Sequence, residues 1–202
     1  MAVVGMLAAV ATGVAGVAGA GVASACIAQP ARSESFAASL PQVWPGQHGP
    51  TVVGLQLALR RLGYPLEGTG FYGVHTLVAV HDYQVKHGIK GSGIVGSRTW
   101  QALVGGKPAV QTHAGPLTNP GLQPGARDQQ TMWLLANALE RIHPYGDFVV
   151  HQPEVPETYG PQWQAQVKDF QRRAGIKASG IVGPRTWQAL YSVVSIEGGW
   201  GC

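Results

Sequence analysis

Residues 88–103 read GIKGSGIVGSRTWQAL, and residues 175–190 read GIKASGIVGPRTWQAL. Only two aligned positions differ, Gly91 against Ala178 and Ser97 against Pro184. Near-identity within one chain indicates that a folding unit has been duplicated. Each block joins a glycine-rich turn to a short helical segment, so the chain is expected to contain the same fold twice.

Apolar residues upstream of the first block recur at helical spacing. Val52, Leu55 and Leu59 lie on one stripe of a helix that Pro50 can begin and Gly63 can end. A second helix is predicted from about Val74 to His87, and a short third one covers 98–103. Helices that are apolar on one side bury those sides against each other, which predicts an all-α, three-helix unit.

The second copy repeats this order. Its first stripe holds Met132, Leu135, Leu139 and Ile142, and its second holds Trp163, Val167 and Phe170. The offset between copies is 80 at Leu55/Leu135 and 87 at Tyr72/Tyr159. The difference predicts seven extra residues in the loop within 143–160.

These patterns divide the chain into six segments. We expect a signal peptide (1–25), a spacer (26–45), repeat 1 (46–104), a linker (105–124), repeat 2 with its loop insertion (125–191) and a tail (192–202). The spacer is rich in Ala, Ser and Pro, and Gly and Pro interrupt every periodicity in the linker.

The N-terminal segment is typical of an export signal. It is apolar, carries no charged side chain before Arg32 and ends in Ala23-Ser24-Ala25, a small-x-small cleavage pattern. The alternative is an uncleaved membrane anchor. Cys26 follows the cleavage pattern, so it is expected to form a disulfide with Cys202, to be acylated as a lipoprotein anchor, or to stay a free thiol. Export predicts a secreted or cell-wall location.

Charge and motifs exclude several function classes. The formal net charge is +4 and no basic run occurs, which argues against nucleic-acid binding. His75, His81 and His87 are six residues apart and face different sides of a helix, so they predict no metal site. The loop residues His143, Asp147, His151 and Glu154 match no ligand spacing. We expect no metal and no cofactor.

Catalysis is not expected either. His81 and Asp82 are adjacent but have no Ser or Cys nucleophile nearby in the sequence, so they do not form a triad. The spacer, linker and tail are each too short for a catalytic domain. The sequence therefore predicts a protein that is not an enzyme.

The motifs of repeat 1 resemble a known family. Val52-x-x-Leu55-Gln56-x-x-Leu59 is followed by Tyr72-Gly73, Tyr83-Gln84, Gly93-Ile94-Val95-Gly96 and Thr99-Trp100. This order is similar to the three-helix peptidoglycan-binding domain of bacterial wall hydrolases. Repeat 2 departs from it, because Ala136 replaces Gln56 and Trp163 replaces Thr76. The resemblance implies peptidoglycan as partner, and repeat 1 carries it better than repeat 2.

Candidate ligand-binding residues follow from that resemblance. Aromatic rings can meet a sugar or sit in the core. The two glutamines can contact the ligand or hydrogen-bond backbone groups of the loop, and a guanidinium in the first turn of the third helix can bind a carboxylate or stay solvated. The candidates are Tyr72, Gln84, Arg98, Trp100, Tyr159, Gln171, Arg185 and Trp187.

The resulting hypothesis is an exported, non-catalytic protein that binds peptidoglycan through two tandem repeats. Two sites on one chain would raise residence on a repetitive polymer. The alternatives are an accessory or remnant of a wall hydrolase, and an interaction or inhibitor module that binds a secreted protein. Membrane contact is expected only if the signal stays uncleaved or Cys26 is lipidated.

Overall fold

The computed structural model describes residues 30–105, 121–142 and 157–197. These residues form seven helices and three isolated β-bridges, which confirms the all-α prediction. The signal peptide, Cys26, Cys202, most of the linker and the loop with His143, Asp147, His151 and Glu154 lie outside the described residues.

Repeat 1 contains the three expected helices, α2 (Pro50–Arg60), α3 (Val74–Lys86) and α4 (Ser97–Val104). Pro50 is the first residue of α2. A backbone N–H at this position has no partner within the helix, so proline costs no hydrogen bond there. Gly63 and Gly88 follow α2 and α3 with φ of 92° and 66°. This left-handed backbone favours glycine and lets the chain turn after each helix.

Repeat 2 repeats the plan with α5 (Gln129–Arg141), α6 (Pro161–Arg173) and α7 (Pro184–Glu197). In each repeat an extended residue before the first helix pairs with the loop before the third. Val43 bridges Val95 in repeat 1, and Leu122 bridges Val182 in repeat 2. The tandem organisation predicted from the duplicated block is therefore confirmed.

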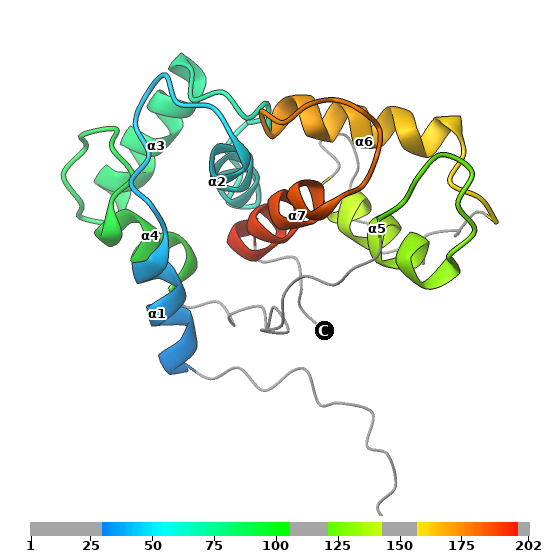
Figure 1. Cartoon of the computed structure of the whole chain (residues 1–202). Helices are drawn as coiled ribbons and strands as arrows, with labels where there is room; N and C mark the ends of the chain where they lie inside the picture. The colour runs from blue at the N-terminus through cyan, green and yellow to red at the C-terminus, as the bar shows by residue number, and fades with distance from the viewer. Residues whose placement is uncertain (1–29, 106–120, 143–156, 198–202) are drawn as a thin grey trace, which may run out of the picture.

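The segment expected to be a spacer contains a helix, α1 (Pro30–Ser39), that packs on α4 (Figure 1). Ala37 is fully buried in the core of repeat 1, and Phe36 and Leu40 pack against it. This part of the chain is not a free spacer, because α1 packs on α4 and these three apolar residues join the core of repeat 1. The linker's last residues also belong to repeat 2, since Leu122 is fully buried.

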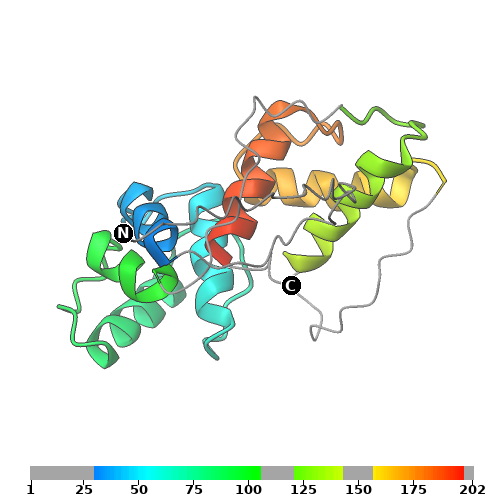
Figure 2. The ribbon, with the colours of Figure 1, turned by 90° about the horizontal axis from the view of Figure 1, so that it is seen from below.

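The first part of the expected tail is helical. α7 is six residues longer than its counterpart α4 and ends at Glu197. Val193, Val194 and Ile196 are fully buried. This extension lies beside α2, and Figures 1 and 2 both show the two helices side by side. Apolar burial against repeat 1 explains why a segment without a motif is ordered.

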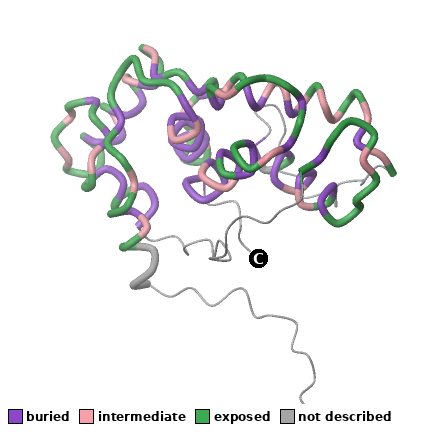
Figure 3. Tube along the Cα trace, viewed as in Figure 1, coloured by how far each residue is buried: buried purple, intermediate pink, exposed green. Residues whose placement is uncertain are grey.

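The two repeats share their cores through this contact. Val53 and Leu57 of α2 belong to the core of repeat 2, and Ile196 of α7 belongs to the core of repeat 1. Eight consecutive residues of α2, Val52 to Leu59, are buried, so the helix is covered on every side (Figure 3). Arg61 and Glu197 form an ion pair at the edge of the contact.

Candidate functional site

The polar residues of the motif hold the turn before the third helix. In repeat 1 the Tyr72 hydroxyl donates to the Gly93 carbonyl at 2.6 Å. The Gln84 amide donates to the Ile94 carbonyl at 2.8 Å and to Thr99 Oγ1 at 3.0 Å, while the Gly93 N–H donates to Gln84 Oε1 at 3.0 Å. Burial raises the pKa of the Tyr72 phenol, which stays protonated as a donor.

Repeat 2 reproduces this network. The Tyr159 hydroxyl donates to the Gly180 carbonyl at 2.6 Å, and the Gln171 amide donates to the Ile181 carbonyl at 2.9 Å and to Thr186 Oγ1 at 3.0 Å. The Gly180 N–H donates to Gln171 Oε1 at 2.9 Å. Satisfied buried amides of this kind fix one backbone conformation.

Six of the eight predicted ligand-binding residues are therefore interior residues. Their exposed fractions are at most 1%, for Tyr72, Gln84, Trp100, Tyr159, Gln171 and Trp187. Trp100 also donates from Nε1 to the Pro41 carbonyl at 2.8 Å. Packing occupies these six side chains in this structure, and all but Trp187 also make internal hydrogen bonds. Ligand contact by them stays a prediction. Arg98 and Arg185 are exposed at the second positions of α4 and α7 and stay candidate contacts.

A different feature of repeat 1 faces solvent. Val74, Val78 and Val85 are 65%, 63% and 57% exposed on α3. With His81 between them they follow the i, i+4, i+7, i+11 spacing of one helix face. Phe71 precedes them, is 52% exposed and packs its ring near Gly73 at the start of α3. We call Phe71, Val74, Val78, His81 and Val85 the α3 stripe.

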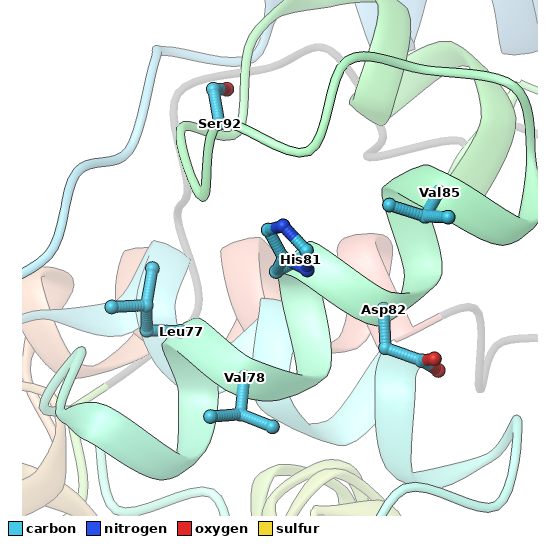
Figure 4. Close-up of a pocket in the computed structure, with 6 residues that line it drawn as sticks. All are labelled: Leu77, Val78, His81, Asp82, Val85 and Ser92. Carbon is cyan, nitrogen blue, oxygen red and sulfur yellow. The ribbon is translucent and has the colours of Figure 1, made fainter.

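A cleft of about 400 Å³ adjoins the stripe. Leu77, Val78, His81, Asp82 and Val85 project from α3, and Ser92 lies on the loop that follows the helix (Figure 4). The lining is mainly aliphatic with three polar groups, a combination typical of small-ligand sites.

The polar groups of the cleft do not form a catalytic triad, although Ser92 does line the same cleft as His81. Asp82 accepts hydrogen bonds from the Tyr64 hydroxyl at 2.8 Å and from Lys86 at 2.7 Å. The hydrogen bonds from Lys86 and Tyr64 lower the pKa of Asp82, which is a carboxylate at neutral pH. Ser92 Oγ accepts from the Ile94 N–H at 3.2 Å, a local turn contact.

The stripe has no counterpart in repeat 2. At the offset of 87, the positions of Val74, Val78, His81 and Val85 hold Pro161, Ala165, Lys168 and Arg172. Gln164 replaces the cleft residue Leu77, and Asp169 pairs with Arg172 at 3.1 Å and with Arg173 at 2.7 Å. Sequence reasoning missed the stripe because it followed the core residues Thr76, Val80 and Tyr83. The sequence signal for the stripe was a second series of apolar residues, Val74, Val78 and Val85, on the other side of the same helix.

The described residues contain no cluster of three or more His, Cys, Asp or Glu side chains that could hold a metal ion. His87 is used internally, with Nδ1 2.8 Å from the Tyr83 carbonyl and its ring 4.0 Å from that of Tyr83. Over the same three ranges, no helix is long and apolar enough to cross a membrane.

Comparison with known proteins places both repeats in one family. Residues 48–103 and 134–190 match the family described as "Putative peptidoglycan binding domain". The chain is also 30% identical over 160 residues to a protein of Bacillus licheniformis named "Probable N-acetylmuramoyl-L-alanine amidase". That similarity covers 74% of this chain and 44% of the relative, so the chain spans less than half of the relative's length.

Proposed function

This chain belongs to the peptidoglycan-binding domain family, and from that premise we propose that it is an exported, non-catalytic protein that attaches to the bacterial cell wall. In this proposal the α3 stripe and the adjoining cleft of repeat 1 make the main contact with peptidoglycan. Repeat 2 contributes little direct contact.

The exposed α3 stripe is the observation that carries this proposal. Apolar side chains gathered on one exposed face are a feature of binding surfaces, and Val74, Val78 and Val85 are each more than half exposed on one face of α3. Peptidoglycan presents methyl groups on its N-acetyl and alanyl units, which suit an aliphatic surface. The polar atoms of His81, Asp82 and Ser92 lie where they can orient such a ligand.

Two further features support an exported, non-catalytic role. The apolar leader ending in Ala23-Ser24-Ala25 supports export. The buried amides Gln84 and Gln171 are committed to holding loops, and Asp82 is bonded to Tyr64 and Lys86 rather than to His81. Amide side chains do not transfer protons, and Asp82 is not paired with His81 as in an acid–base dyad.

A matched pair of substitutions tests the site. Val78→Glu places a charge in the stripe, and Ala165→Glu places the same charge at the same helical position of repeat 2. Both positions are exposed, so both variants are expected to fold. Retention on insoluble purified peptidoglycan should fall about tenfold or more for Val78→Glu, because an apolar contact is replaced by a desolvated charge.

Ala165→Glu is expected to be retained like the wild type. Equal losses for both variants, or no loss for either, would contradict the assignment of the site to repeat 1. Failure of the wild-type chain to sediment with peptidoglycan would contradict the proposed function itself.

The amidase relative favours one alternative, an accessory role beside a wall hydrolase. The chain would then hold a hydrolase or its substrate in place. Clearing of a suspension of purified cell walls by the chain alone would show catalysis and overturn the non-catalytic proposal. Faster clearing only when a separate amidase is added would favour the accessory role.

A further inference from the structure

Arg173 of repeat 2 reaches across to repeat 1. Its guanidinium donates from Nε to Asp169 Oδ2 at 2.7 Å, which fixes the direction of the side chain. Nη1 donates to the backbone carbonyls of Glu67 and Gly68 in repeat 1 at 3.1 and 3.4 Å. The side chain is only 19% exposed, so these bonds are partly shielded from water.

The backbones meet at the same place. Gly70 has a φ of 79°, and a Cβ built on it would lie 1.9 Å from the Arg173 carbonyl oxygen. Only glycine permits both this φ and this approach. Segment 67–71 of repeat 1 therefore lies directly against the end of α6.

Segment 67–71 ends in the α3 stripe. From inside repeat 1, Gln56 accepts from the Gly70 N–H at 2.9 Å and donates to the Phe71 carbonyl at 2.9 Å. Phe71 then packs near Gly73 at the start of α3. The segment is thus held on one side by Gln56 and on the other by Arg173.

The matching position in repeat 1 is used differently. Lys86, the counterpart of Arg173 at the offset of 87, pairs with Asp82 as Arg173 pairs with Asp169. Lys86 lies over the Tyr64 ring at 5.6 Å, within its own repeat. Repeat 2 also has Ala136 in place of Gln56 and no exposed valine stripe. Repeat 2 thus has the same ion pair as repeat 1, but its arginine also contacts the other repeat.

We infer that repeat 2 acts as a built-in support for the binding face of repeat 1, with Arg173 as a positioning residue for segment 67–71 and Phe71. This inference rests on the proposed function of the α3 stripe. The face of α6 that corresponds to the α3 stripe lacks its valines, and Arg173 contacts repeat 1. Repeat 2 is therefore assigned a supporting function and not a second binding site of the same kind.

Arg173→Ala and Arg172→Ala make a matched test in the full chain. Both residues pair with Asp169, and Arg173 is the one that donates to the carbonyls of Glu67 and Gly68 in repeat 1. Hydrogen exchange of the peptide covering 67–71 should be about three- to tenfold faster in Arg173→Ala and unchanged in Arg172→Ala. Retention on insoluble peptidoglycan should fall several-fold for Arg173→Ala only.

Arg173→Lys keeps a donor that can reach the carbonyls, so it should restore part of both effects. Faster exchange with full retention, or unchanged exchange, would overturn the inference. Loss of retention in both arginine variants would also overturn it, because it would show a general charge effect. A wild-type chain that is not retained would instead remove the proposed function, and the exchange measurement would still decide whether Arg173 positions the segment.

Discussion

In repeat 1 the solvent side of α3 carries Val74, Val78 and Val85, whereas α6 of repeat 2 holds Pro161, Ala165 and Arg172 at the same positions. On the inner sides, Val80 matches Val167 and Gln84 matches Gln171, although Trp163 replaces Thr76. Gln84 and Gln171 make the same three hydrogen bonds with distances that agree within 0.1 Å. The hydrogen bonds that hold the loop before the third helix are thus the same in both repeats, whereas the outer faces of the two helices differ.

The largest expected effect tests whether the repeats are one folding unit. Trp100→Ala and Trp187→Ala each empty the centre of one repeat, and loss of a buried tryptophan costs about 3–5 kcal/mol of unfolding free energy. Because Val53, Leu57 and Ile196 connect the cores, each variant should lower the midpoint of a single urea transition followed by circular dichroism.

Two separated transitions, with only the mutated repeat destabilised, would contradict a joint core. The pair would then behave as independent domains on one chain.

A smaller effect is expected at Gly54, where α2 and α7 meet. A Cβ on Gly54 would lie 2.8 Å from Ile196 Cβ. This overlap cannot be relieved by a side-chain rotation, because Cβ is fixed to the backbone. Gly→Ala inside a helix ordinarily stabilises by roughly 0.5–1 kcal/mol, but here overpacking should reverse the sign and destabilise by about 1–3 kcal/mol. Urea denaturation of Gly54→Ala measures the change.

The double variant Gly54→Ala with Ile196→Gly should cost less than the sum of its single changes, because removing the Cβ of residue 196 relieves the clash. Additive losses would contradict the close approach of the two helices.

The smallest expected effect is a pH dependence shared by the two repeats. Hydrogen bonds from Lys86 and Tyr64 lower the pKa of Asp82 below its ordinary 3.8. For Asp169, partial burial raises the pKa, but the hydrogen bonds and charges of Arg173 and Arg172 outweigh it and the net shift is downward. A lowered folded-state pKa stabilises the protein above the ordinary value, and this contribution is lost as pH falls through the folded pKa.

At pH 6, Asp82→Asn and Asp169→Asn should therefore have a smaller unfolding free energy than the wild type. The difference should shrink as the pH falls below about 4. Urea titrations at pH 6 and pH 3 measure this. A difference that grows toward low pH would contradict the sign of both shifts.

The duplicated fold could be predicted from the sequence because its signals are local. Apolar spacing located six helices, and Gly63 and Gly88 marked turns that do have positive φ. α1 was missed because the described apolar residues that join the core, Phe36, Ala37 and Leu40, form too short a pattern to recognise before α4 is in place. The extension of α7 was missed because its apolar residues bury against the other repeat.

The site was harder to predict than the fold. A family motif collects residues that every member needs, and here Tyr72, Gln84 and Trp100 are needed inside. Periodicity shows which face of α3 turns inward but not whether the outer valines end up covered. That depends on how the repeats pack, and the packing covers α2 while leaving α3 open.

The contact between the repeats is head-to-tail, and this has a consequence for chain growth. α2 contacts α7 through Val53 and Leu57. The same positions of α5 hold Trp133, which is 51% exposed, and the half-buried Asn137. The Asn137 amide donates to the Trp133 carbonyl at 2.8 Å. Contacts of this class can propagate into an open array unless the receiving surface changes. Leu134 stands at the position of Gly54, where α2 has no room even for a Cβ against α7. Leu134 and Asn137 together make α5 a poorer receiver than α2 for the extended α7 of another copy.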